Sequence, residues 1–212
     1  MSQNKTLNIS IFILVLFHVS GIFGINSSYK DWFLSLTPLT LLLSTFLLFL
    51  NNSKLNLKII ASFLLVFLLG LSIEIIGVKT GKIFGAYHYG ENLGWKFMEV
   101  PVTIGMNWAA LCFAAIILAK KHIQNLFLRL LIAAIIPVAI DFPIETLCES
   151  LDFWYWENNG IAPLQNYIAW FVSSFAFVSF LNYSLKDVKN PFAPYYLAVQ
   201  FLFFFVLNLL NI

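Results

Sequence analysis

The chain has 212 residues, of which 60% are hydrophobic and 17% aromatic, whereas only 10% are charged. A soluble domain carries about 25% charged residues, so this composition excludes an ordinary water-soluble enzyme or binding domain. The formal net charge of +2 gives no indication of nucleic-acid binding. The sequence also lacks a phosphate-binding loop, a dinucleotide fingerprint and a nucleophile elbow.

Seven apolar stretches approach the roughly 20 residues that a helix needs to cross the hydrocarbon core of a bilayer. They cover about residues 7–25, 33–50, 58–78, 102–119, 126–147, 161–183 and 193–212. The connections between them are short. We therefore predict one all-α membrane domain over residues 1–212, a bundle of about seven transmembrane helices. The first stretch is expected to be a retained helix rather than a signal peptide.

The charged residues are unevenly divided between the two sides of this bundle. With seven spans, the amino terminus and the second, fourth and sixth loops share one side, which holds eight of the twelve basic residues. Basic residues concentrate in the cytoplasm. We therefore expect a multi-pass protein of the inner cell membrane, with its amino terminus cytoplasmic and its carboxyl terminus outside. Nine of the ten acidic residues lie on the outer side, which indicates a functional mouth there.

Three acidic residues lie inside predicted helices, near their outer ends. Glu74 lies in the third helix, and Asp141 and Glu145 lie one turn apart on one face of the fifth. Pro143 lies between the last two and is expected to bend the helix. Ionisable groups inside a membrane span face the bundle interior and are functional by default. We predict that these three carboxyl groups are catalytic and that one of them acts as an acid.

A structural alternative is that Asp141 or Glu145 pairs with His18 or Lys79 as a lock between helices. His18 itself is expected to be a hydrogen-bonded core histidine. The fifth helix also places Glu149 on the same face, at the interface, where a structural role is expected. The two cysteines indicate neither a disulfide framework nor a metal site.

An aromatic loop follows each of the two acidic helix ends. The first reads FGAYHYGENLGWKF and the second SLDFWYWENNGIAPLQNYIAW. Aromatic faces stabilise cations, so acids beside aromatic walls suit a reaction that forms a carbocation from an apolar substrate. Glycines 77, 81, 85 and 90 are expected to let the first loop pack close to a ligand.

The two regions share a pattern that predicts a parallel internal repeat of helix pairs. After each aromatic loop a proline opens a helix, and a tryptophan follows seven positions later, at Pro101 to Trp108 and at Pro163 to Trp170. In such a repeat Glu74 and Glu145 would occupy related positions.

These segments resemble the membrane carotenoid-biosynthesis proteins that include the carotenoid 1,2-hydratases of bacteria and archaea, of the bisanhydrobacterioruberin and γ-carotene hydratase type. The resemblance covers about residues 70–172. Its pattern consists of Glu74, Gly77, Thr80, Gly81, Phe84, Gly85, Tyr87, Tyr89, Pro101, Trp108, Asp141, Glu145, Trp154, Trp156, Pro163, Asn166 and Trp170. It implies an enzyme that adds water to the terminal double bond of an acyclic carotenoid, without cofactor or metal. The segment GIAPLQN departs from the expected Gly-Val-Pro-like approach to the asparagine, which bears on substrate choice.

The residue pattern and the resemblance together give one expected mechanism. A carboxylic acid, Asp141 or Glu145, protonates the alkene to a tertiary cation, and water adds to that carbon. Glu74 positions the water or takes the second proton. The expected substrate-binding residues are Tyr87, His88, Tyr89, Asn107, Trp108, Trp154, Trp156, Asn166 and Trp170. Among them, His88, Asn107 and Asn166 are expected to orient water or carboxyl groups.

The expected partners are the carotenoid, water, the lipid bilayer and other membrane enzymes of the carotenoid pathway, but not nucleic acid. Two alternatives stay open. A lycopene-type end-group cyclase would begin with the same protonation but capture the cation with a neighbouring double bond. A non-enzymatic small transporter or lipid-binding partner would more often place its ionisable groups near the membrane midplane.

Overall fold

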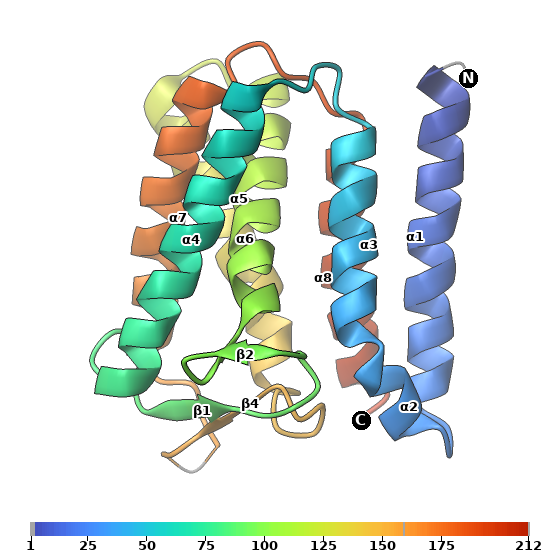
Figure 1. Cartoon of the computed structure of the whole chain (residues 1–212), viewed down its shortest axis with the longest axis vertical. Helices are drawn as coiled ribbons and strands as arrows, with labels where there is room; N and C mark the ends of the chain where they lie inside the picture. The colour runs from blue at the N-terminus through green and yellow to red at the C-terminus, as the bar shows by residue number, and fades with distance from the viewer. Residues whose placement is uncertain (1–2, 159, 212) are drawn as a thin grey trace.

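The structure is a computed structural model that describes residues 3–158 and 160–211, and it is an upright bundle of helices with short strands at one end (Figure 1). The elements in chain order are α1 (Gln3–Ile25), α2 (Lys30–Ser35), α3 (Thr37–Leu50), α4 (Leu57–Thr80), β1 (Tyr87–Tyr89), β2 (Lys96–Phe97), β3 (Val100–Pro101), α5 (Val102–His122), α6 (Leu126–Glu145), β4 (Trp154–Trp156), α7 (Leu164–Ser184) and α8 (Ala193–Leu209). The predicted all-α class is confirmed.

The predicted count of about seven spans is not exact. The described residues form eight helices, of which α1, α4, α5, α6 and α7 are long and apolar enough to cross a membrane. The predicted span 33–50 is divided, because Leu36 ends α2 and Pro38 lies in the first turn of α3, where its missing N–H costs nothing. With 14 residues, α3 is about 21 Å long, shorter than a hydrocarbon core of about 30 Å.

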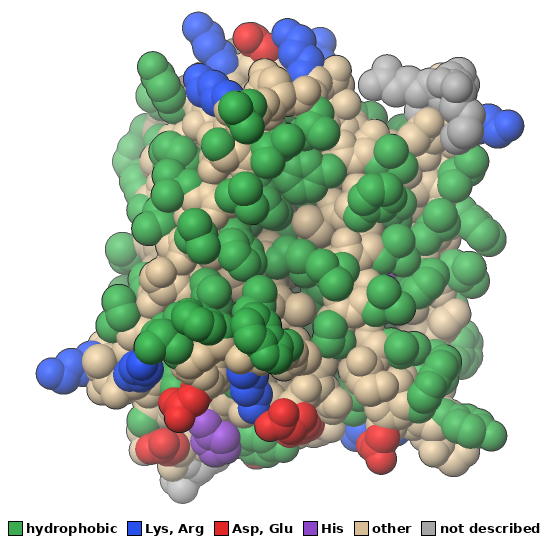
Figure 2. All heavy atoms as spheres, in the orientation of Figure 1, with side chains coloured by type: hydrophobic (Ala, Val, Ile, Leu, Met, Phe, Trp, Pro, Cys, Tyr) green, Lys and Arg blue, Asp and Glu red, His purple; other side chains and the backbone are tan. Residues whose placement is uncertain are grey.

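The surface is divided into two polar ends and an apolar belt (Figure 2). Hydrophobic side chains cover the middle of the bundle. Lysine and arginine gather at the end that holds the amino terminus, and most acidic side chains in view lie at the strand end, where the chain also finishes. This division is the one that a membrane-spanning bundle requires, with charges only where water or headgroups are available.

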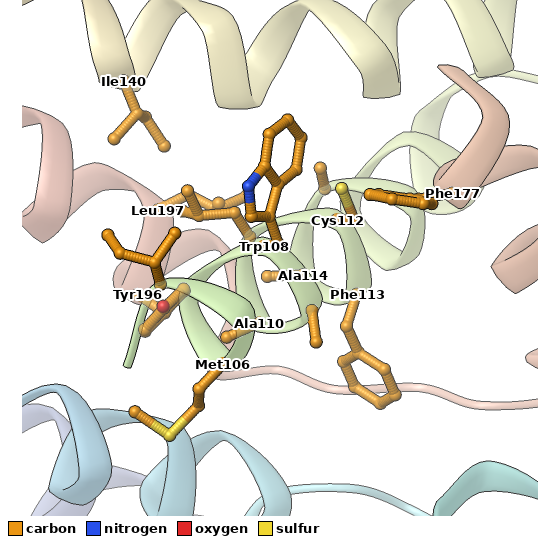
Figure 3. Packing of buried hydrophobic residues seen from close by; sticks show 14 of the residues in the cluster. Met106, Trp108, Ala110, Cys112, Phe113, Ala114, Ile140, Phe177, Tyr196 and Leu197 are labelled. Atoms are coloured by element: carbon orange, nitrogen blue, oxygen red, sulfur yellow. The ribbon is translucent and has the colours of Figure 1, made fainter. Parts of the chain in front are cut away.

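Helix α5 forms the centre of the bundle and is buried along almost its whole length. It packs against α4, α6, α7 and α8. Small side chains such as Ala110 and Ala114 let neighbouring helices approach closely, and Trp108, Cys112 and Phe113 fill the space between them (Figure 3). Both cysteines of the chain are free and buried.

Two helices that carry the acidic residues begin with the same kind of cap. The side chain of Asn56 accepts a hydrogen bond from the Ile59 N–H at the start of α4, and Asn125 does the same for Leu128 at the start of α6. Such caps satisfy backbone donors that a helix start leaves free. Both helices run from the basic end to the strand end, where α6 ends two residues after Pro143.

The aromatic loops contain strands that the sequence analysis did not predict. Strands β1 and β4 pair antiparallel, and Tyr87 lies opposite Trp156 while Tyr89 lies opposite Trp154. Strands β2 and β3 form a second short pair. Because side chains alternate across a strand, the four aromatic residues share one face of the β1–β4 ribbon.

The glycines near the end of α4 lie against other parts of the protein. Gly81 ends the helix with a φ of +63°, a left-handed conformation that glycine adopts without strain. A Cβ added at Gly77 would lie 2.6 Å from Phe84 Cδ2, so the returning chain needs a glycine there to lie against the helix.

Candidate active site

The three acidic residues predicted to be catalytic meet around one cavity. Glu74 lies two turns before the end of α4, and Asp141 and Glu145 lie one turn apart in the last turns of α6. Their side chains are 2%, 3% and 6% exposed, so all three are enclosed by protein. The cavity between them has a volume of about 60 Å³.

Glu74 is held by three hydrogen-bond donors. Its Oε2 accepts from the hydroxyls of Tyr87 and Tyr89, the latter at 2.8 Å, and its Oε1 accepts from the indole N–H of Trp108 at 2.8 Å. Burial and the Glu74 carboxylate raise the pKa of both tyrosines well above the usual value, so both phenols keep the protons that they donate.

Glu145 is held in a similar way, by nitrogen donors. Its Oε2 accepts from the indole N–H groups of Trp154 and Trp156 at 3.1 and 2.8 Å. Its Oε1 accepts from the side-chain amide of Asn166 at 2.5 Å. An indole nitrogen is only a donor, so Oε2 of Glu145 must act as an acceptor towards both rings.

The two glutamates occupy matching places in the fold. Each lies near the end of a helix, and each accepts from two aromatic residues of the strand that follows it. Trp108 and Trp170, which the sequence pattern places at equivalent positions, stack on each other with ring centroids 3.8 Å apart and planes 15° apart. This geometry agrees with a repeat of the unit helix, strand, helix.

Asp141 differs from the two glutamates because one of its oxygens is not committed. Its Oδ2 is buried and has no hydrogen-bond partner among residues 3–158 and 160–211. The carboxyl group lies close enough to Glu145, Glu74 and Asn166 to interact with all three. A buried polar atom without a partner is costly, so its presence beside a cavity marks a position prepared for a ligand, a water or a transferable proton.

The structure brings most of the predicted binding residues to this cavity but not His88. Asn107 and Trp170 line it, together with Tyr87, Tyr89, Trp154, Trp156 and Asn166. Trp108 donates to Glu74 but is not among the residues that line the cavity. His88 points to the other face of the β1–β4 ribbon, where it is exposed and stacks on Tyr155 with ring centroids 5.3 Å apart. It therefore lies outside the site, because the strand alternation that turns Tyr87 and Tyr89 inward turns His88 outward.

The lock considered for the acidic helix is not formed. Within the described residues the one ion pair joins Lys96 to Glu91, and Lys79 is exposed. His18 is buried and its Nδ1 bonds the carbonyl of Leu14, which confirms the expected core histidine. Glu149 lies beyond the end of α6 and is exposed, so it does not join the cavity.

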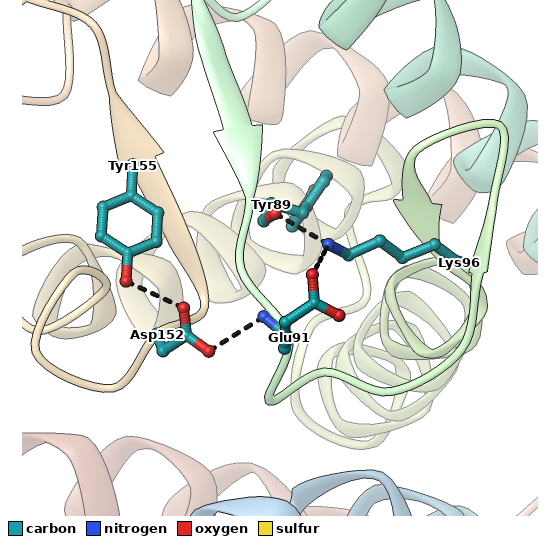
Figure 4. A network of polar contacts seen from close by, with 5 residues as sticks. All are labelled: Tyr89, Glu91, Lys96, Asp152 and Tyr155. Carbon is teal, nitrogen blue, oxygen red and sulfur yellow. Dashed lines mark hydrogen bonds and ion pairs between the residues drawn. The ribbon is translucent and has the colours of Figure 1, made fainter.

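An outer network fixes the ribbon over the site (Figure 4). Asp152 accepts from the hydroxyl of Tyr155 at 2.8 Å and from the backbone N–H of Glu91 at 2.9 Å. Lys96 donates to the Glu91 carboxylate at 2.7 Å and to the backbone carbonyl of Tyr89 at 3.0 Å. These bonds join the two loops, and so they hold the four inward aromatic residues at a fixed depth.

Several lining residues were missed from sequence. The apolar part of the wall includes Leu41, Phe84, Leu93, Ile104, Ile140, Ile144, Phe153 and Phe204. Gln200, from α8, adds a carboxamide that is 5% exposed. No group of three histidine, cysteine, aspartate or glutamate side chains in the described part of the chain could hold a metal ion.

Comparison with known proteins gives two findings. The model of a family described as carotenoid biosynthesis protein matches residues 36–212. The chain is also 28% identical to a bisanhydrobacterioruberin hydratase of Haloarcula japonica over 108 residues. These residues make up 48% of this chain and 37% of that protein. The match thus spans little more than a third of the curated relative. No solved structure matches the chain.

Proposed function

The chain belongs to the family of carotenoid biosynthesis proteins, and we propose that it hydrates the terminal double bond of an acyclic carotenoid end group. One observation carries this proposal. An uncommitted buried carboxyl oxygen, that of Asp141, lies beside two carboxyl groups held by donors, in a small cavity walled by aromatic rings. The similarity to a bisanhydrobacterioruberin hydratase supports the same chemistry.

The first step is a proton transfer from Asp141. The oxygens of Glu74 and Glu145 are occupied as acceptors, so the free Oδ2 of Asp141 is the carboxyl oxygen available to carry a proton into the cavity. The proton adds to the CH carbon of the terminal double bond, whose π electrons form the new C–H bond. The dimethyl-substituted carbon becomes a tertiary cation. The ring faces around the cavity stabilise that charge.

The second step adds water to the cation. A water oxygen bonds to the tertiary carbon and gives up one proton to a carboxylate. Glu145 is placed for this one turn from Asp141, and its Oε1, which accepts from Asn166, has a second lone pair for the proton. Transfer of that proton back to Asp141 restores the starting state, so the net change is the addition of one water. The cavity of about 60 Å³ exceeds the roughly 10–15 Å³ that one water molecule needs, so it has room for the attacking water.

The membrane setting places this chemistry near one surface. The family and the five long apolar helices make the chain a multi-pass membrane protein. We infer that the basic end is cytoplasmic, because lysine and arginine concentrate on that side. The active site would then lie near the outer interface, within reach of water.

The test is expression of the protein in bacteria that accumulate lycopene. The pigments are separated by chromatography, and their molecular masses are measured by mass spectrometry. The wild type is expected to yield a product heavier by one water per end. Asp141→Asn is expected to lower the rate by roughly 10²–10⁴, the usual contribution of a general acid. Asp187→Asn, an exposed acid at the opposite end, is the matched control and should convert normally.

Each other outcome would overturn the proposal in a recognisable way. A lycopene isomer of unchanged mass with a shorter chromophore would identify a cyclase. Unchanged lycopene, with the protein shown to be in the membrane, would exclude hydration of this substrate. Full activity of Asp141→Asn would remove Asp141 from the proton transfer.

A further inference from the structure

A second and larger cavity adjoins the active site and takes no part in the mechanism above. It has a volume of about 350 Å³ and lies between α1, α2, α3 and α8. In Figure 1, α1, α3 and α8 stand together beside the group formed by α4 to α7. Most of the cavity wall is apolar, with Leu16, Phe17, Ile25, Phe33 and Phe203 among its members.

The two cavities share part of their walls. The residues that line both are Thr37, Leu41, Phe153, Gln200 and Phe204. The large cavity is therefore continuous in its lining with the space around the three carboxyl groups. Gln200 is the one carboxamide in this shared wall, and its Nε2 has no hydrogen-bond partner within the described residues.

The volumes of the two cavities indicate that they hold different molecules. An apolar cavity of about 150 Å³ is known to accept benzene, so about 60 Å³ is too small for a branched hydrocarbon end group but large enough for water. The neighbouring 350 Å³ is large enough for such a group and has the apolar lining that it needs. Water and hydrocarbon thus have separate spaces that meet at the shared wall.

We propose that the cavity between α1, α3 and α8 binds the acyclic hydrocarbon end group of the substrate, and that Gln200 positions the attacking water or the new hydroxyl where the two cavities meet. This inference rests on the proposed hydration. The end group lies in the large cavity with its terminal double bond against the shared wall. In this arrangement only the reacting carbons reach the small cavity, which Asp141 lines.

The occupant of the large cavity also follows from its position. Trp32 of α2 lies in its wall and is 59% exposed, as expected for a tryptophan at the level of the lipid headgroups. The cavity thus lies at the same depth as the active site and beside the outermost helix, α1. A long apolar molecule dissolved in the bilayer can place one end there without entering water.

Filling the large cavity without touching the small one tests the binding site. Thr40 lines only the large cavity, so Thr40→Phe puts a ring into it. Leu39→Phe adds the same ring one residue earlier, at a position that is 54% exposed and lines neither cavity, and is the matched control. Purified proteins are compared for the pigment that they retain, by absorbance per protein, and for kcat/KM with lycopene in vesicles.

Thr40→Phe is expected to retain less pigment and to lose roughly tenfold or more in kcat/KM, as for a misfit in an apolar pocket. The control should match the wild type in both. Equal pigment retention and kcat/KM in Thr40→Phe and the control would overturn the inference while leaving hydration intact. If the wild type converts no lycopene but Thr40→Phe still lowers pigment retention, the hydration proposal fails and the binding site stands.

Gln200→Leu tests the second part of the inference. The change removes the free donor at nearly constant size. Pigment retention and KM should stay as in the wild type, whereas kcat should fall, because only water placement is affected. Gln200→Asn, which keeps a carboxamide on a shorter side chain, is expected to recover part of the rate. An unchanged kcat in Gln200→Leu would remove Gln200 from the reaction.

Discussion

Replacing Glu145 separates the stabilising role of its hydrogen bonds from a role in proton transfer. Glu145→Ala removes the acceptor of the two indole N–H groups of Trp154 and Trp156, which can only donate. Asn166 can turn its own oxygen towards another group. A buried donor left without a partner costs about 1–3 kcal/mol, so this variant should lose about 2–6 kcal/mol of unfolding free energy.

Glu145→Gln should behave differently. Its side-chain oxygen can keep both indole bonds, and its amide can donate to Asn166 once that side chain has rotated. The number of hydrogen bonds then stays the same, and the expected loss of stability is below about 1 kcal/mol. A carboxamide cannot accept the proton released by the attacking water. Turnover should therefore fall by roughly 10²–10⁴ although the protein is folded.

Both variants can be measured in detergent. Thermal unfolding followed by size-exclusion chromatography after heating gives the stability, and pigment analysis in vesicles gives the rate. A large destabilisation in Glu145→Gln, equal to that of Glu145→Ala, would refute the reasoning, because the negative charge and not the bond count would then hold the site. Wild-type turnover in Glu145→Gln would exclude Glu145 as the proton acceptor.

Three further predictions concern residues around this centre. Tyr89→Phe removes one donor from Glu74, so melting should show a loss of about 1.5–3 kcal/mol, as for a bond to a charged group; an unchanged melting temperature would contradict that bond. His88→Ala changes an exposed side chain on the outer face of β1 and should leave stability within about 0.5 kcal/mol and product yield unchanged; a loss of product would return His88 to the site. Gly77→Ala forces a Cβ against Phe84 and should cost about 1–3 kcal/mol by thermal unfolding, despite the better helix propensity of alanine; a gain in stability would show that Phe84 moves freely.

The helices and the acidic centre could be predicted from sequence because both depend on local patterns. Long apolar runs fix the spans, and a spacing of four residues fixes the common face of Asp141 and Glu145. The division of the span 33–50 was missed because the stretch is apolar on both sides of it, although Ser35, Thr37 and Pro38 interrupt the run at the boundary. There the helix boundary depends on Leu36 and on the backbone chemistry of Pro38.

The strand pair and the outward position of His88 depend on contacts between distant segments. Tyr-His-Tyr and Trp-Tyr-Trp each alternate in a way that favours a strand, and this signal would have placed His88 and Tyr155 on the outer face. In a loop of aromatic residues near a membrane surface, interfacial anchoring explains the same composition. The pairing of β1 with β4 is what decides between the two.

Gln200 shows a different limit of sequence reasoning. It is one of two carboxamides in the apolar helix α8, the other being Asn208 in the last turn, and it lies on the same face as the buried Tyr196 and Phe204. Because Gln200 lies one turn from Phe204, the sequence indicates that it belongs to the buried face of α8. Nothing in the local sequence says that this face meets both cavities, because the packing of α8 against α1, α5 and α6 determines that.

The stacked indoles of Trp108 and Trp170 also give the protein an intrinsic optical signal. Two indoles whose centroids are 3.8 Å apart share their excited states, so their near-ultraviolet circular dichroism depends on the stack and not on the separate rings. Each ring belongs to a different helix pair, and Trp108 also donates to Glu74. Any movement that separates the two helix pairs, or any ligand that displaces one indole, would change this spectrum, so the change can be followed without an added label. Trp170→Phe would abolish the coupled signal.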